Sequence, residues 1–158
     1  MRLTMIAAAS AAATLSAAAA GAQSVEMSAV PSTVVAVARA AVPGAEWTKA
    51  GVDVDIATMT PVYEITGTIG GRQVEVDVTA AGEIEEIERQ VEMSAVPQKA
   101  QALLKAYLPQ FQPTMVEHST RRGGRVVYEL EGRHDGREVD VEVGEAGDII
   151  TINDDAAA

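Results

Sequence analysis

Apolar residues recur along this chain with two spacings, one typical of helices and one typical of strands. The helical spacing occurs twice, with apolar residues at i, i+3, i+4, i+7 and i+8, first at Val34, Val37, Ala38, Ala41 and Val42 and later at Ala100, Leu103, Leu104, Tyr107 and Leu108. This spacing places one apolar stripe along one side of an α-helix. Pro43-Gly44 and Pro109 follow the two stripes and predict where the helices end.

Alternation with a period of two predicts antiparallel strands after each helix. It is clearest over residues 72–79 and 137–143, where valines on one face alternate with Gln73, Glu75, Asp77 and Thr79 and then with Glu138, Asp140 and Glu142. The other expected strands are residues 46–56, 62–69 and 83–87 after the first helix, and 113–120, 126–132 and 148–152 after the second. Gly70-Gly71 and Asp135-Gly136 have the composition of tight hairpin turns.

The chain contains an internal repeat. Residues 25–31 (VEMSAVP) recur unchanged as residues 91–97, and Tyr63-Glu64 matches Tyr128-Glu129. We therefore expect two copies of one unit, residues 23–90 and residues 91–158, the second with a short polar tail. The predicted fold class is α+β: two tandem helix-plus-antiparallel-meander units (α-β-β-β-β each), with the helices on one face of the sheet and the other face open and acidic.

Residues 1–22 are typical of a secretory signal peptide. Arg2 precedes an apolar run over residues 5–20, and the small residues Ala20 and Ala22 suit cleavage after Ala22. A retained membrane anchor would need about 20 strongly apolar residues, and this run is shorter and rich in alanine. We therefore expect a periplasmic or secreted protein that begins at Gln23 and keeps no stable membrane anchor.

Composition excludes several classes of function. The 158 residues include 12 Lys+Arg, 23 Asp+Glu and no cysteine, so disulfides, thiol nucleophiles and cysteine-ligated zinc are ruled out. Removal of the signal peptide with Arg2 leaves 11 basic residues against 23 acidic ones and a net charge of −12. This charge argues against nucleic acid as a partner.

No motif indicates catalysis or a resident metal. His118 and His134 have no further ligand at metal-binding spacing. Asp77, Gly82 and Glu88 match positions 1, 6 and 12 of a calcium loop, but Thr79 and Ala81 stand where oxygen-rich ligands are needed. Nucleophile-elbow, phosphate-loop and dinucleotide motifs are missing from the sequence. We expect no enzyme, no catalytic residue, no metal site and no cofactor.

Alternation places a set of carboxylates on the outer face of the expected sheet. The set is Glu64, Glu75, Asp77, Glu129, Glu131, Glu138, Asp140 and Glu142. One interpretation is a solvated face whose charge prevents aggregation between sheet edges. The other is an interaction face for a basic partner or for divalent cations. Arginines interleave with the carboxylates and weaken the field, and the sequence leaves both interpretations open.

The order of the motifs resembles the PepSY family. The first copy carries the resemblance in Val42-Pro43-Gly44, Val62-Tyr63-Glu64-Ile65, residues 72–78 and Ala81-Gly82-Glu83-Ile84. The second copy repeats it through Val127-Tyr128-Glu129-Leu130, residues 137–143 and Ala146-Gly147-Asp148-Ile149, but has Gln110 where a helix-ending glycine is expected. A tandem pair is also similar to secreted β-lactamase-inhibitor proteins, in which a curved sheet grips its target.

The resemblance implies a function and no catalytic site. It implies an exported, non-enzymatic protein-binding module of PepSY type in the cell envelope, with a peptidase or another envelope protein as partner and peptidase inhibition or regulation as its use. The alternative is an acidic cation-binding or envelope-sensing protein without a protease target.

Overall fold

The computed structural model describes residues 22–154, and these residues form one antiparallel sheet of nine strands in which each strand pairs with the next along the chain. The strands are β1 (Gln23–Val25), β2 (Glu46–Asp55), β3 (Thr60–Ile69), β4 (Arg72–Thr79), β5 (Ile84–Gln90), β6 (Gln112–Arg121), β7 (Arg125–His134), β8 (Arg137–Gly144) and β9 (Ile149–Asp154). The expected signal peptide, apart from Ala22, lies outside the described residues.

Two helices of ten residues each interrupt the strand order in this part of the chain. They are α1 (Ser32–Ala41) and α2 (Gln98–Tyr107), each preceded by a short 3-10 turn, η1 (Met27–Ala29) or η2 (Met93–Ala95). Within residues 22–154, neither helix has the length and apolar character needed to cross a membrane.

The predicted fold class of two tandem helix-plus-meander units is wrong. The structure is one continuous nine-stranded sheet that carries only two short helices. The reason lies at the joint, where β5 pairs with β6 from Glu86↔Arg121 to Gln90↔Glu117. An unpaired β5 would expose a row of backbone N–H and C=O groups, and this pairing satisfies them. The three-residue strand β1, which the alternation did not predict, extends the sheet beyond β2.

The individual strand positions agree with the alternation. Residues 72–79 are a strand as predicted, and the other seven predicted strands lie within a few residues of their expected bounds. The Gly70-Gly71 turn has φ values of 59° and 80°, in the left-handed region that a two-residue hairpin turn requires. Helix α1 begins at Ser32, directly after Pro31, and ends two residues before Pro43.

Each helix covers a core of its own on one face of the sheet. Val34 and Ala38 of α1 are fully buried in a cluster with Val74, Val76 and Val78 of β4. Ala100 and Leu104 of α2 lie in a second cluster with the valines of β8. A fully buried valine contributes about 1.5–3 kcal/mol, so the apolar stripes fix which face of the sheet the helices cover.

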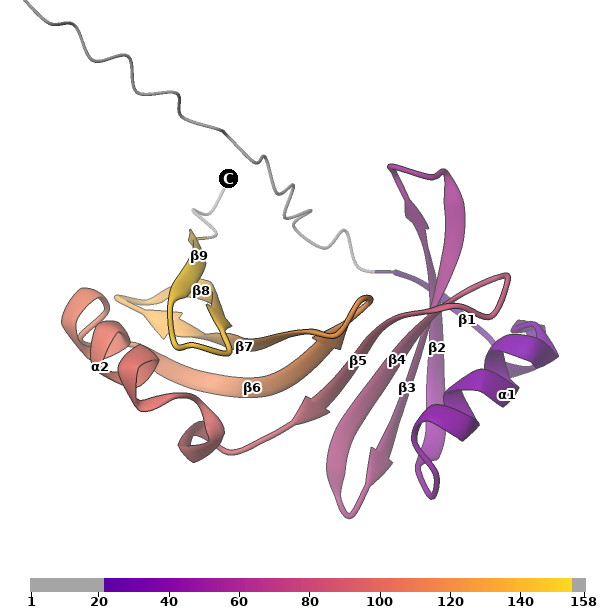
Figure 1. Ribbon diagram of the computed structural model, residues 1–158, viewed down its shortest axis with the longest axis horizontal. Helices are drawn as coiled ribbons and strands as arrows, with labels where there is room; N and C mark the ends of the chain where they lie inside the picture. Colours follow the sequence, from indigo (N-terminus) through magenta and orange to yellow (C-terminus); the bar gives the residue numbers. More distant parts are fainter. Residues whose placement is uncertain (1–21, 155–158) are drawn as a thin grey trace, which may run out of the picture.

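The sheet is strongly bent, with both helices on its outer side (Figure 1). Four register irregularities accompany the bend, between Trp47 and Lys49, Asp77 and Val78, Pro113 and Met115, and Glu142 and Val143. Such bulges bend a strand and increase its twist. The face opposite the helices therefore becomes concave, and we call it the concave face.

Candidate functional site

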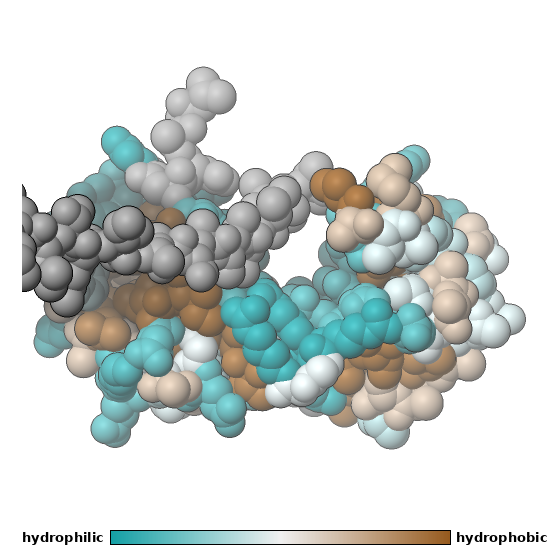
Figure 2. Space-filling model, turned by 45° about the horizontal axis from the view of Figure 1, so that its top comes forward, coloured by the Kyte–Doolittle hydropathy of each residue, from teal (hydrophilic) through white to brown (hydrophobic). Residues whose placement is uncertain are grey.

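Cross-strand register places the acidic residues on the concave face. Residues directly opposite each other in a sheet point to the same side. One row runs Glu64↔Asp77↔Glu86↔Arg121, and a second runs Gln90↔Glu117↔Glu129↔Glu142. Figure 2 brings the open side of the bend forward and shows hydrophilic surface across the middle of the molecule, between more hydrophobic areas. The concave face is therefore a charged hollow.

All eight carboxylates of the predicted interaction face lie on the concave face, in two groups. Glu64, Glu75 and Asp77 lie on β3 and β4, and Glu129, Glu131, Glu138, Asp140 and Glu142 lie on β7 and β8. The register brings Glu64 opposite Asp77, Glu129 opposite Glu142 and Glu131 opposite Asp140. The expectation of an open acidic face needs correction, because Glu129 and Glu142 are only 33% and 16% exposed, and only the outer members such as Glu131 and Glu138 are exposed.

The two groups are connected by residues that the sequence analysis did not select. They are Glu86 and Glu88 of β5 and Glu117, Ser119 and Arg121 of β6. The alternation of Glu117, Ser119 and Arg121 with Val116, His118 and Thr120 is the signal that could have found them. The missing information was that β5 and β6 are neighbours, which brings Glu88 opposite Ser119.

Arg121 is the central cation of the concave face. Its guanidinium donates to three carboxylates, with Nε 2.8 Å from Glu86 Oε1, Nη2 3.0 Å from Glu129 Oε1 and Nη1 3.0 Å from Glu142 Oε1. Arg125 Nη2 lies 2.8 Å from the same oxygen of Glu142, and Ser119 Oγ donates to Glu86. Burial alone would lower the pKa of Arg121, but its hydrogen bond to Glu86 and the surrounding carboxylates raise that pKa. The guanidinium is therefore permanently charged.

Other carboxylates on the concave face have no such partner. Glu88 makes no ion pair with any described residue. Glu117 is only 8% exposed, and its Oε1, like Asp77 Oδ1, is buried without a hydrogen-bond partner. Leaving a buried acceptor unsatisfied costs about 1–3 kcal/mol. The fold therefore holds the carboxyl groups of Glu117 and Asp77 in an environment that costs free energy.

Burial and mutual repulsion raise the pKa of these carboxyl groups. Burial, reinforced by Glu129 and Glu117, raises the pKa of Glu88 to about 10. Burial, with Glu75 and Glu64, raises the pKa of Asp77 to about 8, and burial followed by nearby carboxylates raises that of Glu117 to about 7. Desolvation and like charges both disfavour the ionised form. A cation that enters this region would favour the ionised form and lower these pKa values.

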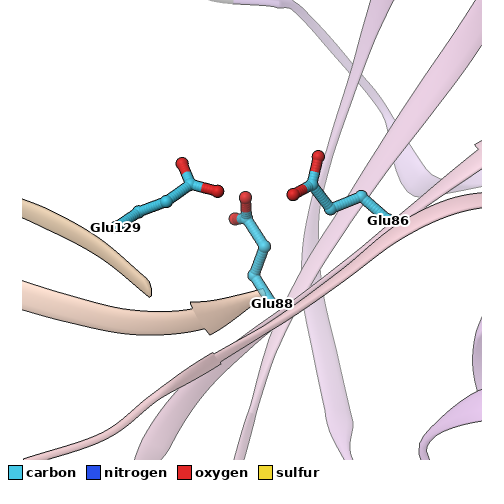
Figure 3. Close-up of side chains that lie close together, drawn as sticks. All are labelled: Glu86, Glu88 and Glu129. Atoms are coloured by element: carbon cyan, nitrogen blue, oxygen red, sulfur yellow. The ribbon is translucent and has the colours of Figure 1, made fainter. Parts of the chain in front are cut away.

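Glu86, Glu88 and Glu129 converge on one point. Each offers a carboxylate oxygen, and these oxygens lie within 4.8 Å of one another. Figure 3 shows the three side chains pointing toward one another, two from β5 and one from β7. Neither His118 nor His134 joins this cluster. Asp77, Gly82 and Glu88 lie on β4, a turn and β5, so they do not form a helix-flanked calcium loop. Glu88 instead reaches the cluster from strand β5.

A second exposed feature is the tip of the β2–β3 hairpin, which projects beyond the rest of the sheet (Figure 1). Ile56 and Met59 at this tip are 72% and 73% exposed. The turn is held by Asp55, whose carboxylate accepts hydrogen bonds from the backbone N–H groups of Ala57 and Thr58 at 2.8 and 3.2 Å. Two large apolar side chains on a fixed, protruding turn are suited to contact with another molecule.

Residues 31–88, from the residue before α1 to within β5, match the model of the family described as Peptidase propeptide and YPEB domain, or PepSY. This confirms the resemblance found in the first copy of the repeat. Among curated proteins, no sequence matches the chain.

Solved structures share the fold across both halves of the chain. A DUF2874 family protein from Bacteroides uniformis superposes with a TM-score of 0.64 at 14% identity, covering 78% of this chain and 88% of that one. A BLIP-like protein from Bacteroides fragilis gives 0.61 at 15% identity, with 81% and 88% covered. A candidate periplasmic protein from Bacteroides eggerthii gives 0.64 at 11% identity, with 79% and 88% covered. At these identities the likeness shows a common fold.

Proposed function

We propose that this chain, whose residues 31–88 form a PepSY domain, is an exported, non-enzymatic module that binds a basic segment of an envelope protein on its concave face. A peptidase is the partner class that we favour, because the matching family is described by its occurrence in peptidase propeptides. The signal-like residues 1–22 and the fold shared with a candidate periplasmic protein support export. In this role the module would occupy the cleft of the peptidase and restrain it.

The observation that carries the proposal is the surplus of carboxyl groups over basic side chains on the concave face. Arg121 and Arg125 pair with Glu86, Glu129 and Glu142, while Glu88 and Asp77 have no basic partner among the described residues and have raised pKa values. Lysine or arginine side chains of a partner would supply the missing donors. Complementary charge of this kind speeds association and selects the partner.

The exposed hairpin tip supports a protein partner over a small basic molecule. A stable protein interface buries about 800 Å² on each partner and depends on a few apolar or aromatic anchors. Ile56 and Met59 offer such anchors beyond the end of the charged hollow. The charged face would select the partner, and the apolar tip would add affinity.

Affinity capture with matched charge variants tests this function. The bait is residues 23–158, compared with a Glu131→Gln/Glu138→Gln variant of the concave face and a Glu26→Gln/Glu145→Gln control. All four glutamates are exposed, and each variant removes the same charge. We expect the wild-type chain and the control to recover the same envelope protein from an extract, and the concave-face variant to lose at least about 90% of it, which corresponds to 1.4 kcal/mol in binding.

Two outcomes would contradict the proposal. One is recovery of only those proteins that wash off together at moderate salt, because screening removes unspecific attraction between exposed charges. The other is equal loss of the partner in both double variants, which would assign the binding to net charge and not to the concave face.

A further inference from the structure

We infer that Glu86, Glu88 and Glu129, with the buried Glu117 beside them on the same face, form a binding site for a divalent cation with oxygen ligands, of the Ca²⁺ type, in the middle of the concave face. The inference does not depend on a protein partner. It would add a ligand of defined charge and geometry to the surface proposed above.

The spacing of the carboxylates fits a calcium-sized ion. Calcium is bound by oxygen ligands at about 2.3–2.6 Å, so two oxygens on opposite sides of the ion are about 4.6–5.2 Å apart. The oxygens of Glu86, Glu88 and Glu129 lie within 4.8 Å of one another. An ion between them would contact all three with little movement. Magnesium requires about 2.0–2.1 Å and a regular octahedron, which makes it the poorer fit.

A second observation points to a ligand at the same place. Glu117 is more than nine-tenths buried, and its Oε1 has no hydrogen-bond partner. It lies opposite Glu129 in the β6–β7 register, two residues from Ser119, which itself lies opposite Glu88. Its side chain therefore occupies the same face as the three converging carboxylates. A buried carboxylate oxygen without a donor is satisfied by a cation beside it.

Arg121 positions two of the ligands without neutralising the site. It binds one oxygen, Oε1, of Glu86 and of Glu129, which fixes both carboxylates and leaves the second oxygen of each for another cation. Its third contact is with Glu142, which also binds Arg125. Glu88 and Glu117 make no ion pair with the described residues. Two guanidinium groups thus face five carboxyl groups, so the site offers more oxygen ligands than Arg121 and Arg125 engage.

Calcium titration of residues 23–158, by calorimetry at constant ionic strength after removal of metals, tests the site. We expect one ion per chain, with a Kd at or below the ~10⁻⁴–10⁻³ M of extracellular calcium modules. Because the ion binds the folded state, the Tm must rise with calcium concentration. We expect a smaller effect of Mg²⁺.

Glu88→Gln is the decisive variant, and Glu145→Gln, an exposed change on the β8–β9 turn, is its charge-matched control. We expect Glu88→Gln to keep the fold and to weaken calcium binding at least tenfold, and Glu145→Gln to bind as the wild-type chain does. If Glu88→Gln does not fold, Glu117→Gln takes its place with the same expectation.

Three results would overturn the site. The first is lack of saturable binding by the wild-type chain at about 10 mM Ca²⁺, which lies above the usual range of Kd values. The others are calcium affinity weakened equally in the Glu145→Gln control, or calcium affinity unchanged in Glu88→Gln or Glu117→Gln. Because the titration contains the metal alone, its failure leaves the proposed protein partner unaffected. Conversely, failure to capture a partner leaves the calcium titration unaffected.

Discussion

Arg121 on β6 binds Glu86 on β5 across the joint between the two halves of the chain, with Nε 2.8 Å from Oε1. The same guanidinium reaches Glu129 and Glu142 on the next two strands. One side chain therefore links β5, β6, β7 and β8 on the concave face. The charged face is thus part of what holds the continuous sheet together at its centre.

Replacing Arg121 should destabilise the whole sheet. Arg121→Gln leaves Glu86 and Glu129 without their cation and Glu142 with Arg125 alone, and we expect a loss of about 2 kcal/mol in the free energy of unfolding. This is less than the ~3–5 kcal/mol of a fully buried pair, because 29% of the side chain stays exposed. The neighbouring Arg122 makes only exposed ion pairs, so Arg122→Gln should leave stability near that of the wild-type chain. Urea unfolding of both variants checks this, and equal losses would contradict the central role of Arg121.

Stability should fall as the pH rises. The pKa of Asp77 lies near 8 in the folded chain and near 4 when unfolded, so the folded state holds the proton more tightly. The stability that protonated Asp77 contributes is fully present below about pH 4 and is lost as the pH rises through 8. The loss is at most about 1.4 kcal/mol per pH unit, and solvent around this half-buried group makes it smaller. Asp77→Asn should flatten this dependence, and Asp135→Asn, at an exposed turn, should not. Melting curves at pH 5, 7 and 9 measure it, and a wild-type Tm that rises over this range would contradict it.

Gly67 and Gly132 should not tolerate a side chain. A Cβ at Gly67 would overlap the carbonyl oxygen of Glu46, and one at Gly132 would lie 2.5 Å from that of Gln112 and 2.6 Å from the ring of Phe111. Alanine at either position should cost about 1–3 kcal/mol or more. Gly144, on β8, is the control, since its Cβ would meet Ile150 at an ordinary 3.6 Å. In chemical unfolding, Gly67→Ala and Gly132→Ala should be less stable than Gly144→Ala. A Gly67→Ala chain as stable as Gly144→Ala would contradict this prediction and show that β2 shifts away from the new side chain.

The hairpin tip should contribute to binding and not to folding. Ile56→Ser/Met59→Ser removes two side chains that are more than 70% exposed, so we expect the Tm to change little. Affinity for the captured partner should fall at least tenfold, as for two anchors of an interface. Ile152→Ser, an exposed change on β9, is the control. Unchanged affinity in the double variant would remove the tip from the interface.

Local alternation predicted the strands, but the assembly depended on long-range pairing. Valines 74, 76 and 78 identify β4 and its buried face without any tertiary information. The joining of β5 to β6 depends on pairing between distant segments, which no local period encodes. On β5 the alternation is also interrupted, since Asp77 lies opposite Glu86 and Val78 opposite Ile84, leaving Glu85 as an extra residue. This irregularity obscured Glu86 and Glu88.

The sequence predicted which face of the sheet carries the candidate residues, but not how deeply each of them is buried. Alternation places Glu117 and Glu131 on the same side of the sheet, but bending buries Glu117 and leaves Glu131 exposed. Bending arises from bulges and from the packing of the helices on the outer face, and neither is visible in a residue pattern. Depth is what raises the pKa of Glu117 to about 7 and makes its carboxylate unusual.

Site-specific photocrosslinking tests the central claim, that the concave face binds an envelope protein, most directly. A photoreactive residue replaces exposed Thr68 on the concave face in one chain and exposed Lys105 on α2, on the outer side, in another. We predict that position 68 crosslinks one envelope protein and that position 105 does not. Equal crosslinking from both positions, or crosslinking from position 105 alone, would contradict the claim.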